Sequence, residues 1–224
     1  MVGHKNLWIV ANFKSRKNIK EVLSWIGEVG PKLERIDNLK IAVCPSYSAL
    51  SEAKKAIQVG NFPLLLGSQS LSNFPPGPYT GEEPAQFLKE FVDLSIVGHS
   101  ERRQNFKESE EQITQKVHLA NENGIEPLLC IQGQDTNIPE GVKLIAYEPV
   151  FAIGTGTPDT PENANQVAAA IKQKYSDTEV LYGGSVDEKN VQEFISQENI
   201  NGVLVGSASL SEESFLAIVN SCLN

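Results

Sequence analysis

Short apolar runs alternate with amphipathic segments along this chain. The apolar runs are rich in Val, Ile and Leu, which is typical of parallel strands buried on both faces. Eight of them are predicted to be strands: residues 7–11, 40–44, 63–67, 94–97, 126–131, 142–145, 179–182 and 202–205. Strand and helix signals therefore follow one another from end to end.

Helical signals fill most of the intervals between these runs. Two capping boxes, Asn18 with Glu21 and Ser109 with Gln112, predict helix starts, because each polar pair can satisfy free backbone N–H groups. The other predicted helices run from Pro45 to about Val59, through Phe87, Leu88 and Phe91, from a Thr160 cap to about Tyr175, from Asp187 to Ile195, and onward from Ser211.

Eight parallel strands with helices between them predict an α/β fold, a closed (β/α)8 TIM barrel. Only Gln132 to Gly141 separates the fifth strand from the sixth, so the crossover helix there should be shortened or absent. The chain has 224 residues, 40% of them hydrophobic, which fits one sizeable core. We expect a single barrel domain over residues 1–224.

The net charge and the cysteines of the chain limit which binding partners, metal sites and cellular compartments are expected. A net charge of −9 argues against nucleic acid and anionic membranes, which attract basic surfaces. No apolar run reaches the roughly 18 residues of a membrane span, and the first residues do not resemble a signal peptide. Cys44, Cys130 and Cys222 have no paired or metal-type spacing, so we expect buried thiols, no metal site and a cytoplasmic protein.

Polar residues follow several strands at the ends that a barrel brings to one face. Asn12, Lys14, His99 and Glu148 all lie at such ends. Small residues follow the last two strands, in Gly183-Gly184-Ser185 and Gly206-Ser207, where barrel enzymes commonly bind phosphate. A carboxylate, an imidazole, a lysine and an amide without a nucleophile or metal set indicate proton transfer beside a carbonyl.

Two loops have compositions that suggest a function. Pro149 to Thr157 places apolar residues between a proline and a glycine pair, which suits a lid over a bound molecule. Ser70 to Gly81 is long and rich in Asn, Pro and Gly. We interpret it as a loop that grips a partner, with a functionless insertion as the alternative.

Five motifs, in order along the chain, resemble those of the triosephosphate isomerase family. They are Asn12-Phe13-Lys14, Gly98 to Arg103, Ala146 to Gly156, Tyr182 to Val186, and Leu204-Val205-Gly206. The resemblance covers nearly the whole chain. It implies interconversion of dihydroxyacetone phosphate and glyceraldehyde 3-phosphate, in glycolysis and gluconeogenesis, without a cofactor.

The same resemblance implies a role for each site residue. Glu148 would be the base, neutral His99 would polarise the carbonyl, and Lys14 and Asn12 would stabilise the enediolate. Gly154, Ser185, Gly206 and Ser207 would hold the phosphate. Tyr182 and Glu101 would support the site, and Thr80 would reach the neighbouring subunit's active site. Glu101 has an equally good structural interpretation, as the partner of an arginine.

The chain departs from the family pattern at a few positions. Phe13 and Phe151 replace tryptophans, and Gln132-Gly133 replaces the usual Gly-Glu. Because phenylalanine has no N–H to donate, we expect the lid's open position to be held less specifically. Ser207 replaces a glycine of the family's phosphate site, and we expect Pro158 to stiffen the lid's hinge.

Oligomeric state and two rival functions stay open at this point. The missing crossover helix resembles short archaeal members, which are often tetrameric, whereas the long Ser70–Gly81 loop resembles dimeric ones; a homodimer is favoured. One rival is an aldose-ketose isomerase of a larger sugar phosphate. The other is a barrel without catalysis that serves as a scaffold, although Lys14, His99 and Glu148 are all present.

Overall fold

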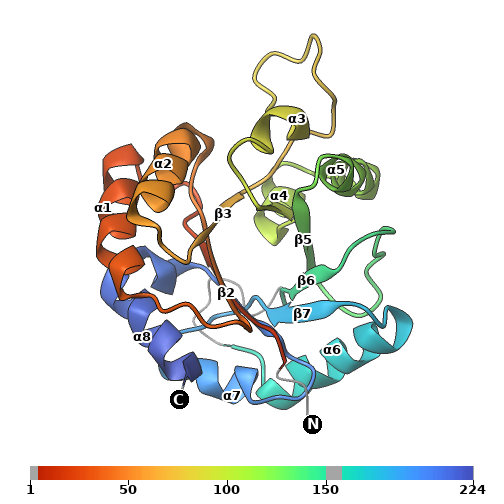
Figure 1. Ribbon diagram of the computed structural model, residues 1–224. Coiled ribbons are helices and arrows are strands. Elements are labelled where there is room, and N and C mark those ends of the chain that lie inside the picture. The colour runs from red at the N-terminus through yellow and green to blue at the C-terminus, as the bar shows by residue number, and fades with distance from the viewer. Residues whose placement is uncertain (1–4, 150–157, 224) are drawn as a thin grey trace.

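Eight parallel strands form a closed barrel, in which each strand pairs with the next and β8 pairs with β1. The computed structural model describes residues 5–149 and 158–223 (Figure 1). The strands are β1 Leu7–Asn12, β2 Leu39–Cys44, β3 Leu65–Ser68, β4 Leu94–Val97, β5 Glu126–Ile131, β6 Leu144–Tyr147, β7 Glu179–Tyr182 and β8 Gly202–Val205. The predicted fold class is confirmed, and all eight predicted strands are present.

Helices surround the barrel on its outer side (Figure 1). They are α1 Ile19–Val29, α2 Leu50–Gly60, α3 Ala85–Leu88, α4 Ser100–Asn105, α5 Glu110–Glu122, α6 Pro161–Lys174, α7 Val191–Ile195 and α8 Glu212–Leu223. Short 3₁₀ helices are η1 Gly30–Lys32, η2 Tyr47–Ala49 and η4 Ser207–Leu210. Residues 132–143, all of them described, contain no helix, as predicted for the fifth crossover.

Both predicted capping boxes form. The Asn18 side chain accepts from Glu21 N at 3.1 Å, and the Glu21 carboxylate accepts from Asn18 N at 2.8 Å. The Ser109 and Gln112 pair makes the same reciprocal contacts, at 3.2 and 2.9 Å. Each box satisfies two N–H groups that a helix start leaves free, which fixes where α1 and α5 begin.

Three helical segments differ from the prediction. The helix expected from Asp187 starts only at Val191, because the Asp187 and Asn190 side chains accept each other's backbone N–H and form a turn instead. The helix expected through Phe91 is the single turn α3, on which Phe87 is 53% exposed. Helix α4 was not predicted, since its sequence is polar and shows no apolar periodicity.

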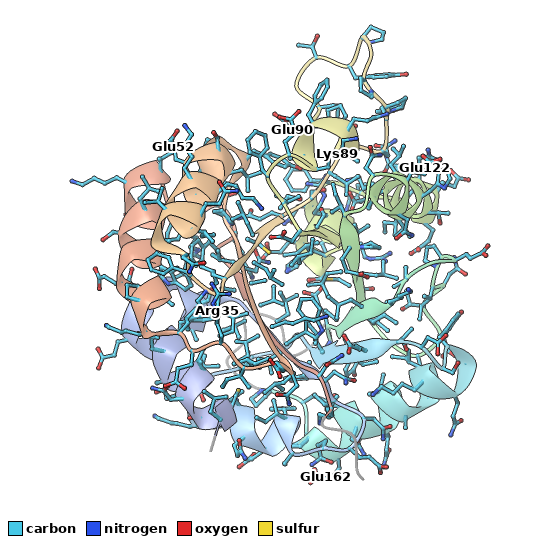
Figure 2. All side chains as sticks on the ribbon, in the orientation of Figure 1. Arg35, Glu52, Lys89, Glu90, Glu122 and Glu162 are labelled. Carbon is cyan, nitrogen blue, oxygen red and sulfur yellow. The ribbon has the colours of Figure 1, made fainter. Side chains whose placement is uncertain are left out.

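Side-chain alternation along the strands divides the core into two layers. Trp8 and Val10 of β1 face the barrel interior, whereas Ile9 and Ala11 face the surrounding helices. Charged side chains such as Glu52, Lys89 and Glu162 lie on the exposed outer surface (Figure 2). The alternation matters for function, because it decides which residues reach the barrel axis at the strand ends.

The three cysteines and His118 differ in how far they are buried. Cys44 and Cys130 are buried free thiols as predicted, while Cys222 is only partly buried. His118 of α5 is solvent-exposed and contacts Glu122 at 3.2 Å. Among the described residues, no helix is both long enough and apolar enough to cross a bilayer.

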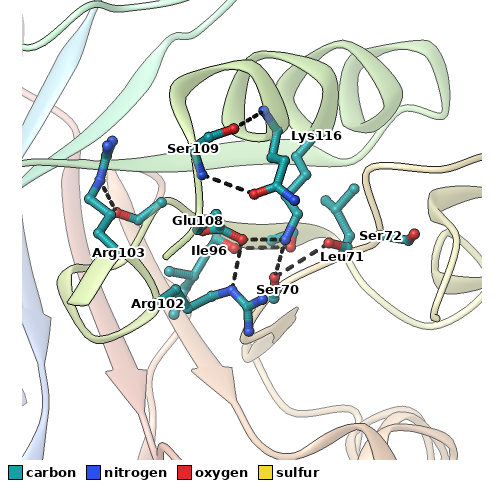
Figure 3. Close-up of polar contacts among 12 residues, drawn as sticks. Ser70, Leu71, Ser72, Ile96, Arg102, Arg103, Glu108, Ser109 and Lys116 are labelled. Atoms are coloured by element: carbon teal, nitrogen blue, oxygen red, sulfur yellow. Dashed lines mark hydrogen bonds and ion pairs between the residues drawn. The ribbon is translucent and has the colours of Figure 1, made fainter. Parts of the chain in front are cut away.

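A buried ion pair supports the start of the long loop. Lys116 of α5 contacts the Glu108 carboxylate and donates to Ser70 Oγ at 2.9 Å (Figure 3). Arg102 of α4 donates to the same Glu108 oxygen at 2.8 Å. The Lys116 and Glu108 side chains are only 4% and 3% exposed. Ser70, where the loop begins, is therefore bound directly to α5 through Lys116, and through Glu108 this contact extends to Arg102 of α4.

Candidate active site

Alternate residues of β1 and β6 face the barrel interior, and this alternation brings polar residues to the barrel axis at the strand ends. Asn12 follows Val10 by two positions, and Glu148 follows Ala146 by two, and both apolar residues face the interior. Both polar side chains are buried, at 5% and 2% exposure. Buried polar groups at this end of a barrel are typical of its active site.

Lys14 is held in a left-handed turn just after β1. Its φ is +51°, which is unusual for a residue with a side chain. Asn12 Oδ1 accepts from Lys14 N at 3.0 Å, and Gln69 Nε2 donates to Lys14 O at 2.7 Å. Lys14 Nζ then lies 2.6 Å from Glu101 Oε1. The strained turn therefore points the ammonium group across the barrel mouth.

His99 and Glu148 are in direct contact. His99 Nε2 lies 3.0 Å from Glu148 Oε1, and Ser100 N donates to Glu148 Oε2 at 2.9 Å. His99 Nδ1 accepts from Glu101 N at 3.2 Å, at the start of α4. Because Nδ1 is an acceptor, the imidazole proton lies on Nε2 and the ring is neutral. The imidazole N–H thus faces the same space as the carboxylate.

Burial controls the ionisation of Glu148. Desolvation raises the pKa of its carboxyl above the ordinary range, although His99, the Ser100 N–H and Lys14 each oppose that rise. Cys130 lies beside it, and burial followed by the Glu148 charge raises the pKa of the Cys130 thiol. A carboxylate with a raised pKa is a stronger base than an exposed one, which suits proton abstraction.

A cavity of about 290 Å³ joins this polar cluster to the small residues that follow β7 and β8. Its lining includes Asn12, Lys14, His99, Glu148, Gly183, Gly184, Ser185, Gly206 and Ser207. A Cβ at Gly183 would lie 3.0 Å from Glu148 Cγ, so a larger residue here would press on the glutamate side chain. The cavity wall therefore combines the acid-base groups with the small residues that follow β7 and β8.

The structure brings most of the predicted site residues together. Asn12, Lys14, His99, Glu148, Ser185, Gly206 and Ser207 all line the one cavity. Glu101 pairs with Lys14 rather than with an arginine. Tyr182 lies behind the cavity, and Thr80 lies on the exposed long loop. Gly154 and, apart from Pro149, the predicted lid fall outside the described residues.

Some contributors were not predicted from the sequence. The Ser100 N–H binds the Glu148 carboxylate, and Gln69 fixes the Lys14 turn. Asn190 lines the cavity and donates to Ser185 O at 3.1 Å. A glutamine directly after a strand end was the one available signal for Gln69. Within the described residues, no group of three or more His, Cys, Asp or Glu is placed to hold a metal ion.

Comparisons with known proteins agree with this site. The sequence model of the family described as triosephosphate isomerase matches residues 7–222. Triosephosphate isomerases of Alkaliphilus metalliredigens and Aquifex aeolicus are each 38% identical to the chain, covering 95% of it and 98% of their own length. The crystal structure of triosephosphate isomerase from Bartonella henselae superposes with a TM-score of 0.84 at 29% identity, covering 98% of this chain and 100% of that one.

The matches extend over nearly the whole chain, and they include the strands, the cavity and the segments that carry its polar side chains. The chain belongs to the triosephosphate isomerase family, and it is an isomerase of triose phosphates in glycolysis.

Proposed function

We propose that Glu148 is the base of this isomerase and that neutral His99 is its electrophile. The observation that carries the proposal is the 3.0 Å contact between Glu148 Oε1 and His99 Nε2 inside the cavity. Glu148 would move a proton between the two substrate carbons, while His99 moves protons between their oxygens. Lys14 and Asn12 would stabilise the negative charge that develops on those oxygens.

The phosphate of the substrate would bind at the small-residue end of the cavity, at Ser185, Gly206 and Ser207, with Gly154 from the lid. These residues leave room for an anion to approach backbone N–H groups. The Lys14 ammonium lies near this end, since a Cβ on Gly206 would come within 3.7 Å of Lys14 Nζ. A larger sugar phosphate is disfavoured, because the family whose model matches residues 7–222 acts on triose phosphates.

A negative charge placed among the proposed phosphate-binding residues, here called the phosphate cradle (Gly154, Ser185, Gly206 and Ser207), tests where the phosphate binds. Purified protein should convert glyceraldehyde 3-phosphate to dihydroxyacetone phosphate, and inorganic phosphate should inhibit competitively. Ser207→Asp should raise KM about tenfold or more, because it sets a negative charge beside the phosphate. Ser207→Asn has the same shape without the charge and should raise KM far less. Equal KM values for the two variants would place the phosphate elsewhere.

We further propose that the chain acts as a homodimer. The loop from Ser70 to Gly81 projects from the barrel beyond α3 (Figure 1), and it exposes Phe74 and Tyr79, stacked 4.3 Å apart. Beside the active site, Tyr47 and the 69%-exposed Phe106 line a second cavity of about 240 Å³ that also reaches Lys14. A partner's loop tip with Thr80 would fill that cavity; a tetramer is the alternative.

Sedimentation of the purified protein distinguishes these states. A dimer should have a mass of about 49 kDa, twice that of the 24.5 kDa chain. Tyr79→Asp should shift the protein to monomers, because it buries a charge in the interface. An equally exposed residue remote from the loop, Tyr175, supplies the control Tyr175→Asp. A parent mass near 98 kDa, or a dimer that Tyr79→Asp leaves intact, would contradict the proposal.

Two broader assignments belong to the same proposal. The whole chain, residues 1–224, would form one domain, since the barrel takes strands from both ends of the sequence. The protein would work in the cytoplasm, a reducing compartment that suits three unpaired cysteines.

A further inference from the structure

Asp187 is an acidic residue in the wall of the active-site cavity that the reaction scheme does not use. It is partly buried, and it lies two residues after Ser185, in the turn between β7 and α7. Among the described residues that line this cavity, Lys14 alone has an ammonium or guanidinium group, whereas Glu148 and Asp187 both have carboxylates. The wall is therefore more acidic than basic, although the substrate is an anion.

Hydrogen bonds hold the Asp187 carboxylate in place. Its Oδ1 accepts from Lys189 N at 2.9 Å and from Asn190 N at 3.1 Å. Asn190 Oδ1 accepts in return from Asp187 N at 3.0 Å, and Asn190 Nδ2 donates to Ser185 O at 3.1 Å. The turn that fixes this carboxylate therefore also contacts the backbone of the phosphate cradle.

The carboxylate is close enough to act on an anion in the cradle. Two residues of chain span at most about 7 Å, so the Asp187 side chain and a phosphate at Ser185 are separated by a distance on the order of 10 Å. Charges this far apart still interact at about 0.1 M ionic strength, where the Debye length is about 10 Å. With a dielectric constant between that of the protein surface and that of water, Coulomb's law gives about a threefold effect on affinity for each ligand charge.

We propose that Asp187 sets the affinity of the site for phosphate, because its fixed negative charge repels the anion that Lys14 and the backbone N–H groups attract. The proposal rests on the position given above to the phosphate cradle. Asp187 acts through space and takes no part in the proton transfers. Substrate and product carry the same phosphate, so the repulsion weakens the binding of both and favours release of the product.

Binding of inorganic phosphate to charge variants tests the proposal. Asp187→Asn removes the charge and keeps an oxygen that can accept the same backbone N–H groups. At about 0.1 M ionic strength it should lower the inhibition constant of phosphate about threefold to fivefold, and about 1 M sodium chloride should abolish the difference. KM for glyceraldehyde 3-phosphate should fall with it and kcat should not rise. Glu188→Gln is the control, because Glu188 is an exposed carboxylate that does not line the cavity.

The outcomes separate a charge effect from a change in the shape of the turn. The proposal is overturned if Asp187→Asn leaves the inhibition constant unchanged, if Glu188→Gln lowers it as much, or if the difference persists at high salt. Asp187→Ser also keeps an acceptor oxygen without the charge, so it should match Asp187→Asn and supplies the test where that variant fails to fold. If Ser207→Asp weakens phosphate binding and Asp187→Asn does not strengthen it, the role of Asp187 alone fails. If Ser207→Asp has no effect either, the cradle itself is wrong.

Discussion

Glu148→Gln is expected to lower kcat by about 10³- to 10⁴-fold, equivalent to about 4 to 5.5 kcal/mol of transition-state stabilisation. The amide occupies the same space beside His99 but cannot accept a proton from a carbon. KM should change little, because the phosphate end of the cavity is untouched. The measurement is the coupled turnover of glyceraldehyde 3-phosphate by parent and variant.

Glu148→Asp is the matched control for this result. It keeps the carboxylate and withdraws it by one methylene, so we expect an intermediate loss of about 10²-fold. If Glu148→Gln retains activity within tenfold of the parent, another residue is the base. A parent as slow as the variant would instead mean that this barrel has lost catalysis, as the scaffold alternative supposes.

The raised pKa of Glu148 adds two checks on the same residue. The acid limb of kcat/KM should lie above the ordinary glutamate value of about 4.3, because the base must be ionised to act. The pKa of Glu148 is higher in the folded state than in the unfolded state. Ionisation of Glu148 therefore lowers the free energy of unfolding as the pH rises through the range between these two pKa values. Above it, Glu148→Gln should melt at a temperature no lower than the parent.

Lys116→Met is expected to destabilise the fold by about 3 to 5 kcal/mol, the usual cost of removing one partner of a buried ion pair. It leaves the almost fully buried Glu108 with Arg102 alone and removes the donor to Ser70 Oγ (Figure 3). For a chain of this size the melting temperature should fall by about 10 °C. Thermal unfolding measured by circular dichroism checks this.

Two controls separate the buried pair from loss of a charge in general. Lys89→Met removes an exposed lysine and should change stability by less than about 0.5 kcal/mol. Adding Glu108→Leu to Lys116→Met should restore part of the loss, since it removes the unpaired buried charge. If the Lys116→Met and Lys89→Met variants have the same melting temperature, the buried ion pair does not stabilise the fold.

The pH dependence of this pair has a definite sign. Burial works to raise the pKa of Glu108, but Lys116 and Arg102 outweigh it and hold the pKa below the usual value. With the folded-state pKa depressed, the contribution is complete above the unfolded value of about 4.3 and is lost as the pH falls through the folded value. Acid unfolding of the parent should therefore begin at a lower pH than it would without the pair.

Local rules were enough to predict most of the backbone. The strands β4, β5, β7 and β8 have the predicted bounds, because short runs of Val, Ile and Leu between loops leave few alternatives. Both capping boxes formed because their partners are three residues apart. At one of the three segments where prediction failed, side chains competed with the helix: the turn made by Asp187 and Asn190 delays α7 until Val191.

The sequence by itself determined the order of strands, the closed barrel and the identity of the polar residues at its mouth, since periodicity and local spacing carry that information. Only the tertiary structure decided which of those groups meet. Glu101 binds Lys14, and His99 Nε2 lies against Glu148, through contacts between residues that are distant in the chain. Burial raises the pKa of Glu148 for the same reason, because desolvation comes from the assembled barrel around it.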